Sequence, residues 1–536
     1  MTEPSPVSSR ARRALVATGI WAGITVVVTL LLLGRPVNTR DETWMLWVAT
    51  RMARGEVLYR DVYNVTTPIA AWGAAAAVRV FGVQLAVVRA LAAGTFAAEV
   101  VMALSVARRV GMRVAARVVL VLVLVGFASP LVAFVSLYSA VAILGALVTL
   151  RAVLWWQDRF AAVLPGAAWA VGAAVAVTFW AKPNVGMLAG VAVLAAMAAT
   201  AARTGFRALL PEALRMAGGA VGISVGVVAV VAGTGGWSAF VDQVFLSKGA
   251  YVDVGFSYFT ALSDRVSVLS WGTGEVELHR LLNFVIHVSL PVLVVALVVG
   301  VWCARRASRE QVVALAAFTV AGLLAIFPRP GVNHITGVLP LAATGLAGVW
   351  TLALATRPAA AARAPRPVGP GVLVAGAVAV VAVAVVAVPL VTHRDRPRLE
   401  HDVAHFVGTP VSRSQARAAA RLGTALRDRG VRTVFIVRED AGFLYLRTGA
   451  HNPLPYDIVE RSDLGASGQH GVIDRIVAGE VPWVCLHPPR PHAKADDELV
   501  PRRLERWVRA NLEPAGLLPR CELYRATAGR LTGPRA

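Results

Sequence analysis

Long runs of hydrophobic residues, separated by short basic loops, make up most of the chain. A helix that crosses a membrane needs ~20 mostly apolar residues. The sequence therefore predicts about eleven spans, at 14–33, 85–106, 114–133, 138–156, 162–180, 185–202, 216–235, 281–303, 311–327, 335–355 and 371–391. The run 68–82 is shorter, contains Arg79 and is more amphipathic. We expect it to form a helix that lies against the membrane without crossing it.

The pattern changes after Thr392, where charged residues become dense and Pro and Gly interrupt the chain. Amphipathic stretches at 399–429 and 499–512 predict helices, and the runs 431–437, 443–449, 483–486 and 521–526 predict strands. The expected fold is a multi-pass α-helical membrane protein with a small C-terminal α/β domain. The predicted domains are 1–391, which includes a first external loop at 34–84, and 392–536.

Composition agrees with a polytopic membrane protein, because 57% of the residues are hydrophobic and only 16% are charged, against about a quarter charged in soluble domains. The net charge of +22 does not indicate a nucleic-acid binder, since much of it sits in short loops between apolar runs. If the N-terminus is cytoplasmic and 68–82 does not cross, five basic loops fall on the cytoplasmic side. These are the loops at 108–113, 157–159, 203–215, 305–309 and 357–366. The C-terminal domain is then extracytoplasmic, and the protein lies in the cell (inner or plasma) membrane.

The chain has three cysteines, too few for a disulfide framework or a CxxC metal site. Cys485 and Cys521 both lie in the polar C-terminal region and could pair if that region is outside the cell. The sequence leaves this open.

The stretch from Arg40 to Pro68 contains the best candidate for chemistry. Asp41 and Glu42 follow the first apolar run, and the apolar residues after them predict a short helix that ends at Gly55. One interpretation is structural, with Thr39 as the N-cap and Glu42 as the partner of a capping box. The other is catalytic, and the two are compatible, because a cap could hold Asp41 rigidly.

A resemblance favours catalysis. Asp41-Glu42, Ala49, Gly55, Tyr59-Arg60-Asp61 and Pro68 together resemble the first external loop of the GT-C membrane glycosyltransferases. The most similar group is the protein O-mannosyltransferase family with its bacterial relatives, including the lipid A aminoarabinose transferases. This chain has Thr66-Thr67-Pro68 where the family has Lys-Pro-Pro. The family associates that lysine with the donor phosphate, so this role has no counterpart here.

Three later stretches resemble the family more loosely, in the same order along the chain. Phe179 to Pro183, with Lys182, is similar to the lysine-containing end of a middle span. Arg329 to Pro340, with His334, is similar to the entry to a late span. The stretch 443–456 is similar to a signature of the extracytoplasmic domain of bacterial members.

The resemblance implies a membrane glycosyltransferase, hexosyl or pentosyl, that moves one sugar from a polyprenyl phosphate to an acceptor hydroxyl on the extracytoplasmic face, with inversion. Asp41 would be the catalytic base. Glu42 would orient the acceptor, tune Asp41 or hold a metal. A divalent metal is the one cofactor left open, and its ligands are unknown. The acceptor is a glycan, a lipid or a protein.

The departing lipid phosphate needs cationic groups nearby. The candidate substrate- and phosphate-binding residues are Arg60, Asp61, Lys182, Lys248, Arg329 and His334. Each has a simpler explanation as well: Lys182 and Arg329 could snorkel at span ends, Lys248 could be a surface charge, and His334 could form only hydrogen bonds. Asp61 could brace the loop through Arg60. His401 and His405, four residues apart on a predicted helix, have metal-binding spacing but no third ligand.

Two other classes of protein remain. A transporter or lipid flippase would place ionisable groups in mid-bilayer and repeat its halves, which the sequence does not indicate. A non-catalytic GT-C-like assembly protein is compatible with the missing lysine before Pro68.

Overall fold

The computed structural model describes residues 6–132, 137–160, 166–247, 257–267, 275–327, 330–356, 399–459, 464–465, 467–488 and 500–527. The chain divides into two compact units. The helical unit comprises residues 1–32, 89–227 and 256–395, and the mixed unit comprises 33–88, 228–255 and 396–536. The loop 34–84 thus belongs to the same unit as the C-terminal region.

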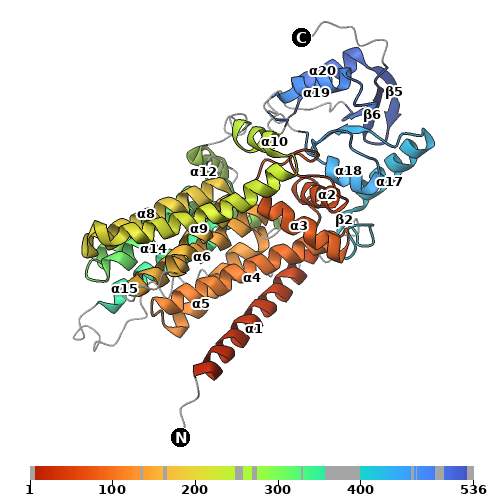
Figure 1. Ribbon diagram of the computed structural model, residues 1–536. Coiled ribbons are helices and arrows are strands. Elements are labelled where there is room, and N and C mark those ends of the chain that lie inside the picture. Colours follow the sequence, from red (N-terminus) through yellow and green to blue (C-terminus); the bar gives the residue numbers. More distant parts are fainter. Residues whose placement is uncertain are drawn as a thin grey trace. The chain divides into compact units, whose positions relative to one another are not determined.

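The described part of the helical unit is made of helices, most of them long and apolar (Figure 1). They are α1 (Pro6–Leu33), α4 (Leu85–Arg109), α5 (Val114–Val132), α6 (Leu137–Arg159), α7 (Gly166–Ala181), α8 (Pro183–Thr204), α9 (Phe206–Gly233), α12 (Tyr258–Ser267), α13 (Glu275–Cys303), α14 (Arg309–Leu324) and α15 (Val332–Ala355). The helices α1, α4 and α9 have residues in both units, because the chain passes from one unit to the other at residues 32, 88 and 227.

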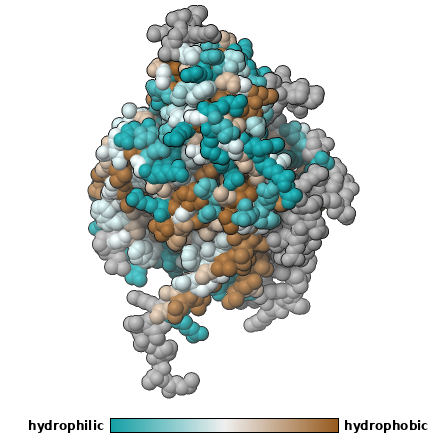
Figure 2. Space-filling model, turned by 90° about the vertical axis from the view of Figure 1, so that its right-hand side faces the viewer, coloured by the Kyte–Doolittle hydropathy of each residue, from teal (hydrophilic) through white to brown (hydrophobic). Residues whose placement is uncertain are grey.

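Seven of the described helices are long and apolar enough to cross a membrane, and they match predicted spans. Helices also form at 114–132, 166–181 and 309–324, but they fall short of the length or the hydropathy that a membrane span requires. The predicted span 371–391 lies outside the described residues, so the number eleven stays a prediction. Many large apolar side chains are exposed, for example Leu15, Val221 and Val298, and Figure 2 shows hydrophobic patches beside hydrophilic ones on the visible face. The chain is a multi-pass membrane protein.

Glycines let the helices of this unit pack closely. Gly145 of α6 lies against Thr178 of α7, and Gly172 of α7 lies against the backbone of Met216 in α9. In a membrane, lipid is as apolar as leucine, so close van der Waals packing at small residues holds helices together.

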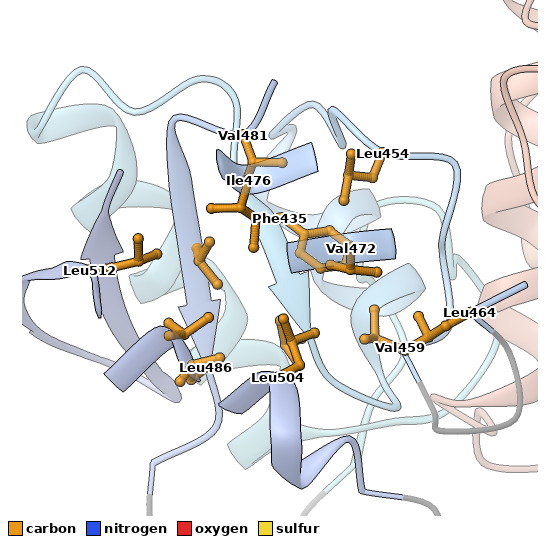
Figure 3. Packing of buried hydrophobic residues seen from close by; sticks show 13 residues of the cluster. Phe435, Leu454, Val459, Leu464, Val472, Ile476, Val481, Leu486, Leu504 and Leu512 are labelled. Atoms are coloured by element: carbon orange, nitrogen blue, oxygen red, sulfur yellow. The ribbon is translucent and has the colours of Figure 1, made fainter. Parts of the chain in front are cut away.

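The mixed unit contains a four-stranded sheet of β3 (Phe435–Val437), β4 (Trp483–Leu486), β6 (Cys521–Arg525) and β5 (Glu513–Leu518), in that order. β3 and β4 are parallel, and β6 is antiparallel to both of its neighbours. α19 (Gly468–Val477) and α20 (Arg502–Asn511) pack against it. Figure 3 shows Phe435 of β3 next to Val472 of α19 in the buried cluster.

The rest of the mixed unit is helical or irregular. It contains α2 (Asp41–Ala53), α3 (Pro68–Phe81), α10 (Trp237–Val241), the π-helix η2 (Asp242–Leu246), α17 (Arg413–Asp428) and α18 (Ala441–Thr448). A short pair of strands, β1 (Leu399–Glu400) and β2 (Val411–Ser412), precedes α17.

The strands predicted at 431–437, 483–486 and 521–526 and the helix at 499–512 form within their predicted ranges. The strand predicted at 443–449 is wrong, because these residues belong to helix α18. Phe443 to Leu446 are all buried, and a short run without a polar face fits a buried strand or a buried helix equally well. Gly449, in the left-handed region at φ 71°, ends the helix.

The helix predicted at 399–429 begins only at Arg413. Gly408 has φ 75°, and Pro410 cannot continue a helix without losing a hydrogen bond. His401 and His405 therefore do not share a helix face. His405 has φ 70°, and its Nδ1 lies 2.9 Å from the carbonyl oxygen of Val83. The metal-binding spacing is lost.

The candidate active site at the start of helix α2

The acid pair lies at the start of α2, and Asn38 holds it there. The Asn38 Oδ1 atom accepts hydrogen bonds from the backbone N–H groups of Arg40 and Asp41, at 2.9 and 3.1 Å. The Asn38 backbone N–H donates to Glu42 Oε2 at 2.9 Å. The two sets of contacts are reciprocal, as in a capping box, but Asn38 lies two residues before the N-cap residue Arg40. The prediction that Thr39 is the N-cap is wrong: α2 begins at Asp41, its N-cap residue Arg40 forms no side-chain cap hydrogen bond, and the Thr39 carbonyl accepts from the Thr43 hydroxyl.

The two acids differ in their surroundings. Glu42 is buried, with 1% of its surface exposed, whereas Asp41 is half-buried. Asp41 Oδ2 accepts a hydrogen bond from Asn38 Nδ2 at 3.1 Å. The side chain is thus oriented by a neutral donor and keeps access to solvent, which a proton acceptor needs.

Further along α2, a buried ion pair connects the helix to the C-terminal part of the same unit. Arg51 Nη1 lies 2.8 Å from Asp457 Oδ1, and both side chains are almost fully buried. The same carboxylate oxygen accepts from Trp47 Nε1 at 2.8 Å and from Asn452 Nδ2 at 2.9 Å. Burial raises the pKa of Asp457, and the charge of Arg51 opposes this shift. The donors Arg51, Trp47 and Asn452 therefore stabilise the ionised form of the buried Asp457 carboxylate.

The other donors of Arg51 hold the loop that follows α2. Its Nε donates to Glu56 at 2.7 Å, and its Nη2 donates to the backbone carbonyl of Asp61 at 2.7 Å. One side chain therefore joins the helix, the following loop and Asp457. We refer to Trp47, Arg51, Asn452 and Asp457 as the α2 clamp.

Helix α18 packs directly on the first turn of α2. A Cβ atom at Gly442 would lie 2.7 Å from the Thr43 carbonyl oxygen, so only glycine allows this approach. Tyr445 of the same helix stacks on Trp47 with ring centroids 5.2 Å apart. The residue after the acid pair is thus in contact with the C-terminal region.

The Tyr59-Arg60-Asp61 motif forms a braced turn. Tyr59 has φ 71°, is buried, and donates its hydroxyl to the Thr66 carbonyl at 2.8 Å. Asp61 pairs with Arg60 at 2.8 Å and accepts from the Val57 N–H. The hydrogen bonds from Arg60 hold the pKa of Asp61 below its usual range. These contacts of Asp61 fit the bracing role.

This turn also holds the segment that follows α9. Gln243 donates to the Tyr59 carbonyl at 2.8 Å and accepts from the Asn64 N–H at 3.0 Å. Phe240 packs edge-on against the Tyr59 ring. The first loop, the segment 237–246 and the C-terminal region therefore form one packed structure.

Helix α3 begins where the family tripeptide is altered. Thr67 precedes the helix in an extended conformation, and Pro68 occupies its first turn, a position that suits proline. Pro68 therefore keeps its place at the start of the helix, although the chain lacks the lysine of the family tripeptide. Whether α3 lies against the membrane stays a prediction.

Two of the predicted cations lie in the helical unit. Lys182 precedes α8, and its Nζ donates to Ser139 Oγ at 3.0 Å and lies 5.5 Å from the Tyr138 ring centroid. His334 lies in the first turn of α15 and is half-buried. Lys248 and Arg329 lie outside the described residues, so their placement stays untested. No set of three or more His, Cys, Asp or Glu side chains within the described ranges is arranged to hold a metal ion.

The sequence did not indicate the α2 clamp. Arg51 appeared as one charge on a short helix, and Asp457 followed the 443–456 stretch without any pattern of its own. Their pairing joins residues 406 positions apart, and only the folded chain brings them together. Cys485 and Cys521, on the neighbouring strands β4 and β6, form a disulfide.

The fold is that of a known class of membrane enzyme. The chain superposes on ArnT from Cupriavidus metallidurans, crystallised with undecaprenyl phosphate, with a TM-score of 0.55 and 16% identity, over 96% of this chain and 99% of that one. A mycobacterial arabinofuranosyltransferase, AftD, gives a TM-score of 0.49 and 13% identity, over 95% of this chain and 40% of that one. The chain has the GT-C fold of membrane glycosyltransferases, as the resemblance implied. No protein-family model and no curated protein matches the chain.

Proposed function

We propose that the chain is a GT-C membrane glycosyltransferase that transfers one sugar from a polyprenyl-phosphate donor to an acceptor hydroxyl at the extracytoplasmic face, with inversion. The observation that carries this proposal is the fixed, half-buried carboxylate of Asp41, in a fold shared along nearly the whole chain with ArnT. ArnT was crystallised with undecaprenyl phosphate, which supports a polyprenyl phosphate as the carrier here.

In this mechanism Asp41 accepts the proton of the acceptor hydroxyl. The acceptor oxygen forms a bond to the anomeric carbon of the sugar, and the bond from that carbon to the phosphate oxygen breaks. The electron pair of that bond leaves with the lipid phosphate. Direct attack from the opposite side inverts the anomeric centre. Base catalysis by a positioned carboxylate contributes about 10²–10⁴ to such a rate.

Glu42 has a different role in this proposal. It is buried and accepts a hydrogen bond from the Asn38 backbone, so it fixes the first turn of α2 and with it the position of Asp41. Of the two acids, the half-buried Asp41 is the one suited to meet an acceptor.

The departing phosphate needs positive charge, and Lys182 and His334 are the described candidates we favour. Lys182 precedes α8, where its Nζ donates to Ser139 Oγ and lies near the Tyr138 ring. Arg60 is less suited, because Asp61 neutralises it. Lys248 and Arg329 remain candidates.

The disulfide between Cys485 and Cys521 supports the extracytoplasmic placement of the mixed unit, since disulfides persist in oxidising compartments. It agrees with the orientation that the basic loops predict.

The proposal is tested by incubating purified protein with polyprenyl-phosphate sugars, hexosyl and pentosyl, and a mixture of envelope acceptors. The expected result is release of lipid monophosphate from one donor, with transfer of the sugar in inverted configuration, read by NMR. A transporter or an assembly protein would leave every donor intact. Consumption of a donor with retained configuration would overturn the inverting mechanism.

A further inference from the structure

The helical unit contains a cavity that the proposed reaction does not use. It has a volume of about 200 Å³ and lies between the ends of α13 and α15. Its lining residues are Trp302, Cys303, Arg305, Arg306, Trp350, Ala353, Leu354 and Thr356. We call it the α13–α15 cavity.

The cavity is positively charged. Two of its lining residues are arginines and none is acidic. Arg305 lies over the Trp302 ring, 4.6 Å from its centroid. Both arginines are exposed, and in the part of the chain that the structure describes neither forms an ion pair. Two uncompensated guanidinium groups side by side suit a phosphate, which they can bind through several N–H donors.

The walls of the cavity are fixed by packing. Trp350 of α15 donates its indole N–H to the Ala296 carbonyl of α13 at 3.1 Å. Gly300 allows this approach, because a Cβ there would lie 3.1 Å from the indole nitrogen. The cavity is therefore a feature of how these two helices pack, and its aromatic wall is held in place.

An apolar surface leads away from the arginines along α13. Val292, Val295, Val299 and Trp302 recur at helical spacing, so they share one face, and all are exposed. Leu354 of α15 is also exposed, at 53%. A ligand that places an anion at the arginines can thus place an apolar chain along the valines. Amphipathic tryptophan at the junction is typical of the membrane–water interface.

We propose that the α13–α15 cavity binds the phosphate head group of an anionic membrane phospholipid, whose acyl chains lie along the valine face of α13. The cavity is smaller than the ~300–1,000 Å³ of sites that enclose a whole drug-sized molecule, which suits a head group alone. The sequence predicts the 305–309 loop on the cytoplasmic side, where anionic lipids are concentrated and attract basic segments. This inference does not rest on the proposed glycosyl transfer.

Cys303 provides a built-in probe, because it lines the cavity while Cys485 and Cys521 are joined in a disulfide. The full-length protein is delipidated in detergent, and alkylation of Cys303 by a maleimide is followed by mass spectrometry. Phosphatidylglycerol, phosphatidylcholine and inorganic phosphate are added separately. The expected result is at least tenfold slower alkylation with phosphatidylglycerol only.

Matched variants test the charge. Arg305→Gln with Arg306→Gln should abolish the protection, whereas Arg309→Gln removes a nearby charge at the start of α14, outside the cavity, and should retain it. Equal loss in both variants would overturn the proposal, as would a Cys303 that does not react in delipidated protein. Equal protection by inorganic phosphate would identify a free-anion site instead. Should the double variant not fold, the lipid comparison on the unaltered protein still decides.

Discussion

Arg51 and Asp457 are 406 residues apart in the chain, and their side chains form a buried ion pair at 2.8 Å. The pair joins the helix that begins with Asp41 to the residue that directly follows the 443–456 stretch. Since the same Asp457 oxygen also holds Trp47 and Asn452, the C-terminal region helps to position the candidate base.

Replacement of Asp457 by Ala should strongly destabilise the protein. The change leaves Arg51 buried without its main counter-charge, and breaking such a pair costs about 3–5 kcal/mol. The check is thermal unfolding in detergent. Asp428→Ala, at the exposed end of α17, is the control and should unfold as the unaltered protein does. The combined change of Arg51 and Asp457 to leucine should be less harmful than Asp457→Ala alone; equal or greater harm would argue against the ion-pair explanation.

Gly442→Ala should disturb the acid pair through the backbone. The new methyl group would meet the Thr43 carbonyl oxygen at 2.7 Å, and overpacking of this kind costs about 1–3 kcal/mol. We expect a lower kcat with an unchanged KM for the donor. Gly73→Ala in α3 is the matched control, because a Cβ there meets nothing within 4 Å. A Gly442→Ala protein with unaltered kcat would show that α18 does not position α2.

The Arg60–Asp61 pair should give the mixed unit an acid-sensitive component of stability. The pKa of Asp61 is lowered in the folded state, chiefly by hydrogen bonds from Arg60. The contribution is thus present above the unfolded pKa of about 4 and is lost as the pH falls through the lower, folded pKa. Unfolding temperatures measured from pH 6 down to pH 3 should fall less steeply for Asp61→Asn than for the unaltered protein. Parallel curves would rule out this linkage.

The disulfide between β4 and β6 should stabilise the sheet, and its loss should be visible on reduction. A native disulfide contributes about 2–4 kcal/mol. Cys485→Ser with Cys521→Ser should lower the unfolding temperature and make it insensitive to dithiothreitol. Cys303→Ser should change neither property. If reduction of the unaltered protein has no effect on unfolding, the bond is absent in the protein as made by the cell.

The length of the apolar runs and the positions of the basic loops were enough to predict a membrane protein and most of its described spans. Both patterns follow from the cost of placing polar groups in lipid. The acid pair at the start of a short helix was also readable from local sequence. The residue that holds the acid pair was misplaced by one position, since Asn38 and Thr39 both carry a short polar side chain that can bond to a helix start. The helix at 441–448 and the α2 clamp could not be predicted, because tertiary burial decides the first and a contact between distant residues makes the second.

The proposed mechanism depends most directly on Asp41, and the transfer rate of Asp41→Asn tests it. Asparagine keeps the shape and can still accept the hydrogen bond from Asn38, but it cannot take a proton. We predict a kcat about 10²–10⁴ lower with an unchanged unfolding temperature, whereas Asp428→Asn keeps full activity. An Asp41→Asn protein that transfers sugar within tenfold of the unaltered rate would contradict the assignment of Asp41 as the base.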